Sequence, residues 1–335
     1  MRAIVTGGFG FIGSHLVQTL LDQGYEVGVV DDLSTGNTSW RQFLGDATRY
    51  HINVSATDLV RSLASRIGKG RVDFVFHLAA KASIVPSIKD PILYHKTNAL
   101  GTLNMLEFAR EVGARKFVYA ASGSCYGIPV EVPTSELCKI DPKYPYALTK
   151  YIGEEYVRMW GELYKLPYVS LRLFNVFGPR MCLGGGYGGF FSTVLPQVFN
   201  RKPVVTIGDG EQRRDFVYVK DVAKAFCMAA EDSTVNNAIF NIGSGTSVSV
   251  NEILELLQVP KSQVVRLPDR PGEPRETLAN ISSVKAALGW NPEVGFESGF
   301  EEMVADRDYW KGARVWTREE SVKAQADWYA YFRKQ

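Results

Sequence analysis

Short apolar runs alternate with longer amphipathic stretches through the first half of the chain, and this alternation constrains the fold more than any other feature. Six runs have the length and residue content of buried strands, and the stretches between them repeat their apolar residues at helical spacing. Such alternation is typical of a parallel sheet covered by helices on both faces. We therefore predict a Rossmann-type, doubly wound α/β domain over residues 1–178. The predicted strands are 2–6, 26–31, 49–53, 72–77, 115–121 and 168–174, and the predicted helices are 11–23, 58–67, 91–112 and 145–165.

The second half of the chain has a different texture. A glycine-rich run at 184–189 follows the last predicted strand, and the later apolar segments are shorter and are interrupted by prolines. A chain of 335 residues has room for two domains of ordinary size. We predict a smaller C-terminal α/β lobe over 179–335 that binds substrate, and we allow for some of its segments returning to the first domain. Residues 319–335 are predicted as a surface helix, and the glycine run is either a flexible linker or a loop that orders over the ligand.

Charge and cysteine content exclude several classes of function. Lys and Arg number 38 against 36 Asp and Glu, so no excess of positive charge indicates a nucleic-acid or anionic-membrane partner. The four cysteines are far apart and have no companion histidine cluster, which argues against a disulfide framework or a metal site. No apolar stretch approaches the roughly 18 residues of a membrane span, and the N-terminus lacks the features of a signal peptide. These features predict a cytoplasmic protein with reduced thiols.

The first predicted strand runs into a glycine-rich turn, Thr6-Gly7-Gly8-Phe9-Gly10-Phe11-Ile12-Gly13. Glycines at this spacing let the backbone turn tightly beside a pyrophosphate, which then faces the N–H groups at the start of the next helix. A plain tight turn is the alternative, but a strand precedes the motif, a helix follows it, and Asp31-Asp32 end the next strand about 20 residues later. The pattern therefore predicts a dinucleotide site.

The acidic pair indicates which dinucleotide is bound. A carboxylate at Asp31 would accept a hydrogen bond from the adenosine ribose 2′-hydroxyl and would repel a 2′-phosphate. This preference favours NAD over NADP. Asp32 is interpreted as a loop or cap residue.

Two segments with hydroxyl side chains are candidates for catalysis. Tyr146 and Lys150 are four residues apart in a predicted helix and so share one face. Such pairs also arise by chance in a chain with 16 tyrosines, so the spacing alone decides nothing. Upstream, Ser122 and Ser124 follow a predicted strand at the edge where open α/β sheets place their active sites. An ordinary polar turn is the alternative explanation for these serines.

Taken in order along the chain, these motifs resemble those of the extended short-chain dehydrogenase/reductase family, and within it the nucleotide-diphospho-sugar 4-epimerases. The likeness covers most of the chain. It rests on the glycine turn, the serine segment and the Tyr146/Lys150 pair, together with five further motifs. These further motifs are residues 77–80, 172–180, 208–219, 270–273 and 288–292.

The resemblance implies catalytic roles for three side chains. Tyr146 would act as acid and base on the sugar hydroxyl, Ser122 would hydrogen-bond the reacting oxygen, and Lys150 would hold the nicotinamide ribose. A phenol with a pKa near 10 needs roughly 4 kcal/mol of phenolate stabilisation to act as a base at pH 7. One cation about 5 Å away supplies roughly 3 kcal/mol at an effective dielectric constant near 20. Lys150 and the nicotinamide charge therefore suffice without a metal.

The resemblance also implies the course of the reaction. A hydride would pass from C4 of the sugar to NAD while Tyr146 removes a proton. The 4-keto sugar would then turn in its pocket and receive the hydride on the opposite face. NAD would be retained as a prosthetic group and regenerated in each turnover.

Further cofactor contacts follow by position in the family motifs. Phe11 and Ile12 begin the helix after the glycine turn. Asn53 and Val54 would meet the adenine, although the family usually has an acidic residue at the first of these two positions. An asparagine at that position still accepts or donates hydrogen bonds.

The segment after the fourth predicted strand carries another set of candidates. Ala79 and Ala80 would pass close to the ribose and pyrophosphate, with plain packing of small residues as the alternative. Lys81 stands where many relatives have a neutral polar residue, and its role is left open. Asn98 is either a hydrogen-bonding partner of the active-site loop or a polar helix residue.

A sugar diphosphate needs positively charged donors, and Arg presents planar bidentate ones. By resemblance, Arg214 and Arg270 would bind the pyrophosphate, and Glu273 would lie near the nucleoside ribose. A solvated charged surface is the alternative, but two arginines in their family motifs favour binding. The remaining substrate contacts that the resemblance implies are Ser122, Ser124, Asn175, Thr193, Val194, Val205 and Ile207. For the last four of these, packing in the apolar core is an equally good explanation.

One position bears on the choice of sugar. By count, Thr277 occupies the place that forms a wall of the sugar pocket in the family. An aromatic residue there restricts the pocket to plain hexoses, whereas a small residue leaves room for a 2-acetamido group. Thr277 therefore predicts that UDP-N-acetylglucosamine and UDP-N-acetylgalactosamine are accommodated, with or without UDP-glucose and UDP-galactose. The uridine is implied by resemblance alone.

Two other functions compete with epimerisation. Dehydratases and decarboxylases of the family need an acid one or two positions after the catalytic serine, and those positions are Gly123 and Ser124 here. A noncatalytic NAD-sensing protein would be expected to have lost one of the three catalytic side chains, and all three are present. An NAD-dependent nucleotide-sugar 4-epimerase is therefore the preferred interpretation.

Relatives commonly dimerise by packing two long helices from each subunit against each other. Segments 91–112 and 145–165 are the candidates for such a homodimer interface. Packing within one subunit is the alternative explanation for most of the same apolar residues.

Overall fold

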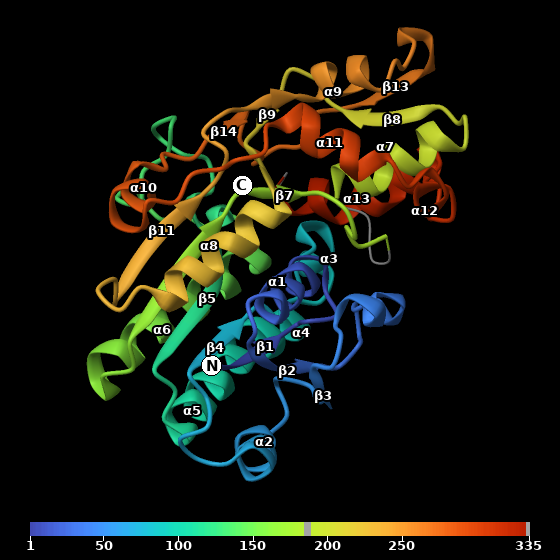
Figure 1. Cartoon of the computed structure of the whole chain (residues 1–335). Helices are drawn as coiled ribbons and strands as arrows, with labels where there is room; N and C mark the ends of the chain where they lie inside the picture. The colour runs from blue at the N-terminus through green and yellow to red at the C-terminus, as the bar shows by residue number, and fades with distance from the viewer. Residues whose placement is uncertain (184–188, 333–335) are drawn as a thin grey trace.

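The computed structural model describes residues 1–183 and 189–332. Its centre is a seven-stranded parallel sheet, as the alternation of apolar runs predicts (Figure 1). In spatial order the strands are β11 (Ala238–Ile242), β6 (Tyr168–Leu173), β5 (Lys116–Ser122), β4 (Phe74–His77), β1 (Arg2–Thr6), β2 (Glu26–Asp31) and β3 (Thr48–His51). Because β1 pairs with both β2 and β4, the strand order reverses there, and ligands of such sheets bind at the carboxyl ends of the strands beside that point.

The sheet has one strand more than the sequence predicts. All six predicted strands are present, and β11 from the second half of the chain adds to the edge by pairing with β6. The run that forms β11 is short and carries a polar residue, Asn241, which obscures its strand character. In the fold this side chain is fully buried, accepting a hydrogen bond of 2.7 Å from the hydroxyl of Tyr126 and donating one of 2.9 Å to the carbonyl of Thr134.

Helices cover both faces of the sheet. Successive residues of β1 alternate between the two cores, since Ala3 and Val5 pack on one side and Ile4 on the other. The first side is covered by α1 (Phe11–Asp22) and α8 (Val219–Glu231), and the second by α2 (Leu59–Ile67), α5 (Gly101–Val112) and α6 (Pro145–Tyr164). This is the doubly wound arrangement that the sequence predicts.

The segment predicted as one helix over 91–112 is helical but not uniform. A first turn, α4 (Pro91–Tyr94), begins with proline, whose fixed φ suits that position. A π-helical segment (His95–Leu100) then leads into α5. Such widened turns are frequent at functional sites, and this one carries Asn98.

The C-terminal lobe consists of short elements around an aromatic cluster in which, for example, the ring centroids of Phe177 and Phe296 are 5.1 Å apart. Its strands are β7 (Asn175–Phe177), β8 (Val204–Ile207), β9 (Arg213–Arg214), β10 (Phe216–Tyr218), β12 (Val248–Ser249), β13 (Val264–Leu267) and β14 (Glu276–Thr277). Its helices are α7 (Phe190–Phe199), α9 (Val250–Leu256), α10 (Ser282–Leu288), α11 (Phe296–Val304), α12 (Arg307–Lys311) and α13 (Arg318–Phe332). The remaining segments are α3 (Ile84–Lys89) and three 3-10 turns at Thr38–Phe43, Gly123–Tyr126 and Lys261–Gln263.

The final helix agrees with the surface helix predicted over 319–335, whose apolar side is expected to carry Trp328, Tyr329 and Phe332. In α13, Trp328 is completely buried, and Asp327 forms an ion pair of 3.2 Å with Lys89 of α3. The helix therefore packs against both lobes, as its position between them in Figure 1 shows. The glycine run 184–189 lies, except for Gly189, outside the described residues.

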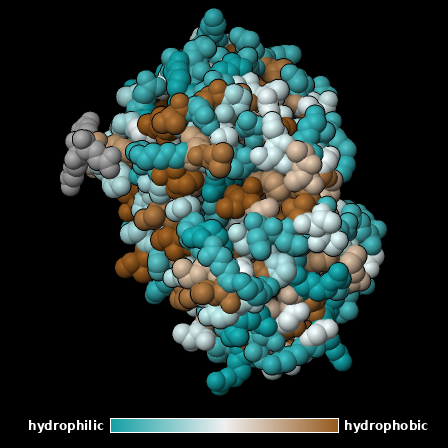
Figure 2. Space-filling model, turned by 90° about the vertical axis from the view of Figure 1, so that its left-hand side faces the viewer, coloured by the Kyte–Doolittle hydropathy of each residue, from teal (hydrophilic) through white to brown (hydrophobic). Residues whose placement is uncertain are grey.

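The surface has no apolar belt on the face shown in Figure 2, where hydrophobic groups are interspersed with hydrophilic ones. Within residues 1–183 and 189–332, no helix has both the length and the apolar content needed to cross a membrane.

Candidate active site

The glycine turn brings bare backbone to the carboxyl end of β1. Gly7 has φ +71°, and a Cβ there would lie 2.9 Å from the backbone nitrogen of Ala79. A Cβ on Gly13 would lie 2.1 Å from the carbonyl oxygen of Gly7, so the start of α1 packs directly on the turn. Gly10 precedes α1, which begins at Phe11 and Ile12. The unpaired N–H groups of this helix start make it suited to a pyrophosphate, as the motif predicts.

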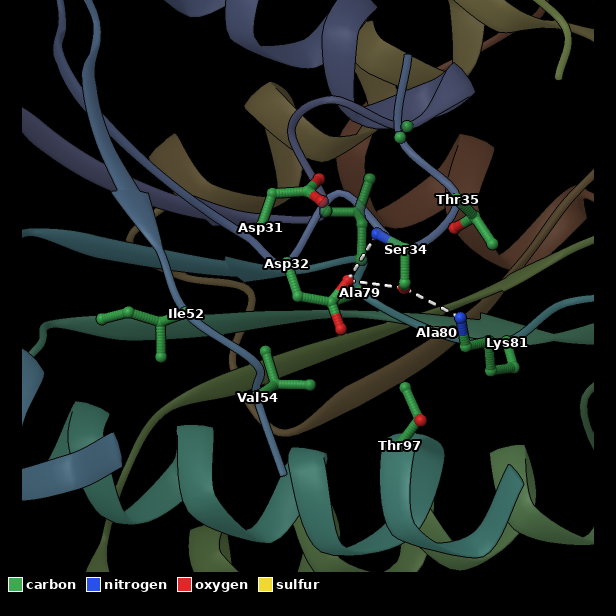
Figure 3. A pocket seen from close by; sticks show the side chains of 14 residues that line it. Asp31, Asp32, Ser34, Thr35, Ile52, Val54, Ala79, Ala80, Lys81 and Thr97 are labelled. Atoms are coloured by element: carbon green, nitrogen blue, oxygen red, sulfur yellow. Dashed lines mark hydrogen bonds between the residues drawn. The ribbon is translucent and has the colours of Figure 1, made fainter. Parts of the chain in front are cut away.

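A pocket opens beside this turn, at the carboxyl ends of β1, β2 and β4 (Figure 3). Its lining contains Gly7, Gly10, Asp31, Val54, Ala79 and Ala80, all predicted to bind the cofactor. It also contains Asp32, Ser34, Thr35, Gly36, Ile52, Leu78, Lys81 and Thr97. In the sequence, Ser34 and Thr35 come shortly after the acidic end of β2. This hydroxyl-containing stretch is the signal that could have indicated Ser34, Thr35 and Gly36.

Asp31 ends β2 inside the pocket. Its carboxylate accepts hydrogen bonds from the backbone N–H groups of Phe9, at 2.9 Å, and Leu33, at 2.8 Å. Burial raises the pKa of this carboxyl, and the two N–H groups oppose that shift. The side chain is therefore held rigidly where the adenosine ribose of a dinucleotide would lie, which fits NAD.

Polar side chains to which the motifs assign no cofactor contact cross the same pocket. The ammonium of Lys81 donates to the hydroxyl of Ser34 at 2.8 Å, and that hydroxyl donates to Asp32 at 2.5 Å (Figure 3). Asp32 also accepts from the amide of Asn53 at 2.9 Å. Asp32, interpreted as a loop or cap residue, thus lies in the pocket wall, whereas Asn53 is not among the residues that line the pocket.

The predicted catalytic side chains come together at the neighbouring strand end. The hydroxyl of Tyr146 lies 3.3 Å from Oγ of Ser122, and Ser122 is 2.8 Å from Oγ of Ser124. Ser122 is the last residue of β5, and Tyr146 is in the first turn of α6, which Pro145 initiates. The chain of hydroxyls connects the phenol to the edge of the sheet.

Lys150 follows Tyr146 one turn later and is buried, with its ammonium 4.3 Å from the ring centroid of Tyr119. Burial lowers the pKa of Lys150 to about 7, and the charge of Glu154 partly opposes the shift. Burial raises the pKa of Tyr146, although the hydrogen bond with Ser122 favours its phenolate. Perturbed acids and bases in a cleft are typical of catalytic sites.

Asn98 connects the π-helical segment to the dinucleotide pocket and to the helix that carries Tyr146 and Lys150. Its amide donates to the carbonyl of Lys81 and to the hydroxyl of Thr149, each at 3.0 Å, while its oxygen accepts from the backbone N–H of Lys81 at 2.8 Å. The first of the two explanations of Asn98, a bond to the active-site loop, is therefore correct. This side chain fixes the pocket segment against the helix that carries Tyr146.

The predicted diphosphate residues gather on the C-terminal lobe. Glu273 forms ion pairs with Arg270 at 2.9 Å and with Arg214 at 3.4 Å. Burial lowers the pKa of Arg214, and Glu273 opposes that shift. A carboxylate between two largely buried guanidinium groups marks a place where anionic oxygens are well accommodated.

The other implied substrate residues are more dispersed. Asn175 is exposed at the start of β7, and Thr277 pairs with Arg214 in the sheet register of β14 and β9. The Thr277 hydroxyl is buried and makes no hydrogen bond to any described residue. Thr193, Val194 and Val205 are buried, and Val194 lies in an apolar cluster, as the core alternative predicts. Ile207, at the end of β8, is partly exposed.

Together, the fold and the site define a Rossmann-fold enzyme that binds a dinucleotide beside a Ser-Tyr-Lys arrangement. The protein-family model of the "NAD dependent epimerase/dehydratase family" matches residues 3–243 of the chain. The chain belongs to this family and uses NAD as its cofactor.

Curated relatives of the chain include enzymes with different reactions. A "Putative UDP-glucose 4-epimerase" of Methanocaldococcus jannaschii is 36% identical over 305 residues, which cover 90% of this chain and 96% of the relative. "UDP-glucuronic acid decarboxylase 1" of Arabidopsis thaliana is 32% identical over 91% of this chain and 69% of the relative.

Solved structures repeat the fold. The UDP-glucose 4-epimerase of Thermus thermophilus in complex with NAD has a TM-score of 0.82 and 34% identity, covering 94% of this chain and 100% of that one. The UDP-N-acetylglucosamine 4-epimerase of Methanobrevibacter ruminantium, in complex with UDP-N-acetylmuramic acid, has a TM-score of 0.80 and 33% identity, covering 92% and 97%.

Proposed function

We propose that this protein epimerises a UDP-sugar at C4. The observation that carries the proposal is the contact of 3.3 Å between the hydroxyls of Tyr146 and Ser122, with the charges of Arg214 and Glu273 acting on the neighbouring Tyr144. A sugar nucleotide whose diphosphate meets the arginines has its hexose directed toward Tyr146. The epimerases among the relatives support this reaction.

The chain's own residues supply binding and proton transfer. Bound NAD supplies the hydride acceptor and donor. Ser122 hydrogen-bonds the C4 oxygen, and Tyr146 takes its proton and later returns one. Burial raises the pKa of Tyr146, and the hydrogen bond with Ser122 opposes this shift. In our proposal the ammonium of Lys150, one turn along the same helix, adds the positive charge that favours the phenolate. Ser124, bonded to Ser122, orients the serine hydroxyl.

Dehydration and decarboxylation are the competing reactions. Because one relative is a UDP-glucuronic acid decarboxylase, decarboxylation has to be tested as well. Dehydration needs an acid that protonates a leaving hydroxyl, and the positions after Ser122 are Gly123 and Ser124. Glu154, an acid one turn beyond Lys150, is paired with Arg172 through a buried contact of 2.6 Å. Its carboxylate is therefore committed to structure, which favours epimerisation.

The identity of the sugar is proposed from Thr277. This residue is small, and its pairing with Arg214 in the register of β14 and β9 supports a position near the proposed diphosphate site. We propose that the pocket accepts a 2-acetamido group, and thus UDP-N-acetylglucosamine and UDP-N-acetylgalactosamine, with or without UDP-glucose and UDP-galactose. The N-acetylglucosamine epimerase among the solved relatives supports this choice.

The reaction is tested by NMR of the products. Purified protein is incubated separately with UDP-glucose, UDP-N-acetylglucosamine and UDP-glucuronate. A C4 epimer is the expected product. A 4-keto-6-deoxy sugar or a pentose with release of CO₂ would establish dehydration or decarboxylation instead.

A noncatalytic NAD-sensing role is tested by Tyr146→Phe. Loss of the phenol should lower turnover by roughly 10²- to 10⁴-fold, the usual value of a positioned acid-base group, while NAD stays bound. Tyr156→Phe on the same helix is the control. Unchanged turnover of Tyr146→Phe would exclude the proposed catalytic role.

Two further proposals concern the oligomeric state and the cellular location of the enzyme. A homodimer through α5 and α6 is supported by exposed apolar side chains on α6, namely Met159, Leu163 and Tyr164. A cytoplasmic location is supported by the four cysteines, all of which are free thiols.

A further inference from the structure

Tyr144 lies two residues before Tyr146 and stands between the two ends of the proposed substrate site. Its ring is nearly parallel to that of Tyr146, with an interplanar angle of 7° and centroids 6.5 Å apart. Burial raises the pKa of the Tyr144 phenol, and the charges of Glu273 and Arg214 act on it as well. Tyr144 therefore borders the path from the diphosphate arginines to the reacting hydroxyl.

Trp328 of α13 lies behind this tyrosine. The ring centroids of Tyr144 and Trp328 are 5.6 Å apart, and Trp328 is completely buried whereas Tyr144 is only half-buried. Tyr144 thus presents the accessible surface, and the indole fixes it from the far side. The indole N–H also donates to the carbonyl of Pro271 at 2.9 Å, which holds Trp328 in place.

The same helix, α13, also contacts the loop at 270–273, which carries Arg270 and Glu273. Gln325 accepts a hydrogen bond of 2.9 Å from Nε of Arg270. The ring of Phe332 lies so close to Gly272 that a Cβ there would be 2.2 Å from it. One helix therefore supports both the arginine that would meet the diphosphate and the tyrosine beside the hexose path.

We propose that Tyr144 is the wall against which the hexose ring of the substrate packs, and that Trp328 positions it, so that α13 belongs to the sugar-selecting part of the enzyme. This inference rests on the proposed function. A pyranose presents a face of C–H groups, and an aromatic ring buries such a face, while the Tyr144 hydroxyl interacts with Ser124. Tyr144 is a specificity-determining residue, and Trp328 is a positioning residue that acts through it.

The test compares the affinities of UDP and UDP-glucose, measured by calorimetry on NAD-loaded protein. The Tyr146→Phe background is used so that the sugar is not converted during the measurement. The ratio of the two dissociation constants reports what the hexose adds to binding. Tyr144→Ser should weaken UDP-glucose about tenfold, which is the upper end of an aromatic contact, while UDP changes less than about twofold.

Conservative and distant variants separate a wall from general support of the fold. Tyr144→Phe keeps the ring and should restore UDP-glucose affinity to within about threefold. Trp328→Ala should weaken UDP-glucose more than UDP. Tyr331→Ala, an exposed aromatic on the same helix, is the matched control and should change neither.

An unchanged ratio in Tyr144→Ser would overturn the proposal, as would equal weakening of UDP and UDP-glucose. This variant decides even if Trp328→Ala loses its fold, because Tyr144 is half-buried at a helix start and is not part of an apolar core. A wild-type protein that binds UDP-glucose more tightly than UDP but never converts it would overturn the proposed function alone.

Discussion

Half-buried Tyr146 and buried Lys150 lie one turn apart at the start of α6, and desolvation shifts their pKa values in opposite directions. The pKa of the phenol is raised, and that of the ammonium is lowered to about 7. Each shift favours the neutral form of the group. In the proposed reaction, attraction between phenolate and ammonium, the hydrogen bond with Ser122 and the charge of bound NAD all favour the phenolate, so we expect the two titrations to be coupled.

This coupling predicts the pH dependence of a Lys150→Met variant. A nearby cation favours the phenolate, so its removal raises the pKa of Tyr146, and the acidic limb of the kcat profile should move to higher pH by about two units. Lys143→Met, which removes a lysine from the loop before the same helix, is the control and should leave the limb in place. A limb that does not move in Lys150→Met would show that the lysine charge does not activate the tyrosine.

Thr277 gives a second prediction for a single side chain. Thr277→Tyr should fill the space proposed for a 2-acetamido group and lower kcat/KM for UDP-N-acetylglucosamine roughly 10- to 100-fold. Turnover of UDP-glucose should stay within about threefold, and Thr277→Ser should leave both substrates unaffected. If Thr277→Tyr slows both sugars equally, this residue is not the wall that distinguishes them.

Residues differ in how far the sequence reveals them. Tyr146, Lys150 and Ser122 are predicted through the resemblance to the family motifs, since the spacing of Tyr146 and Lys150 also arises by chance. The contact between Lys81 and Ser34 joins loops that are 47 positions apart, and no local pattern reports that the two side chains meet. The hydrogen bond from the Asn53 amide to Asp32 joins residues 21 positions apart and is likewise not readable from the sequence, while the adenine contact of Asn53 stays a prediction.

Among the elements, the turn between β1 and α1 has a backbone conformation and a close backbone contact that require glycine. Gly7 combines a positive φ with a Cβ position 2.9 Å from the backbone of Ala79. Gly24, after the same helix, has φ +80° and open space around it. The two glycines therefore separate backbone strain from steric contact.

Gly7→Ala should abolish NAD retention through gel filtration and cost more than about 2 kcal/mol of unfolding free energy, since strain and contact add. Gly24→Ala carries the strain alone, so it should cost about 1 kcal/mol and retain NAD. Chemical denaturation and the absorbance of bound cofactor measure both quantities. Equal loss of NAD in the two variants would show that the turn is not a cofactor contact.

Elements of the first half are predictable because their periodicity is strong, whereas those of the second half depend on tertiary contacts. β11 is recognisable only from its partners, since its central Asn241 becomes acceptable through hydrogen bonds with other elements. The short strands β9, β12 and β14 contain two residues each, too few for any repeat to be read. The apolar side of α13 is readable from its own sequence, whereas its packing partners, α3 and the 270–273 loop, follow from tertiary contacts.

Across the whole molecule, the near balance of 38 basic and 36 acidic residues gains a structural meaning. The proposed ligands carry four phosphates between them, and the chain provides for these with a glycine-rich helix start in one lobe and two arginines in the other. In the structure Glu273 pairs with both arginines and offsets one of their two positive charges. The proposed anion binding is thus local and needs no basic surface.

The proposed reaction requires that a hydride leaves C4 of a UDP-sugar and returns to the opposite face of the same carbon. Incubation with UDP-glucose and UDP-N-acetylglucosamine, each deuterated at C4, tests this requirement by NMR and mass spectrometry. We expect a C4 epimer of at least one sugar that keeps its deuterium at C4 in ordinary water. Loss of the label to solvent, or a product other than a C4 epimer, would contradict the proposed reaction.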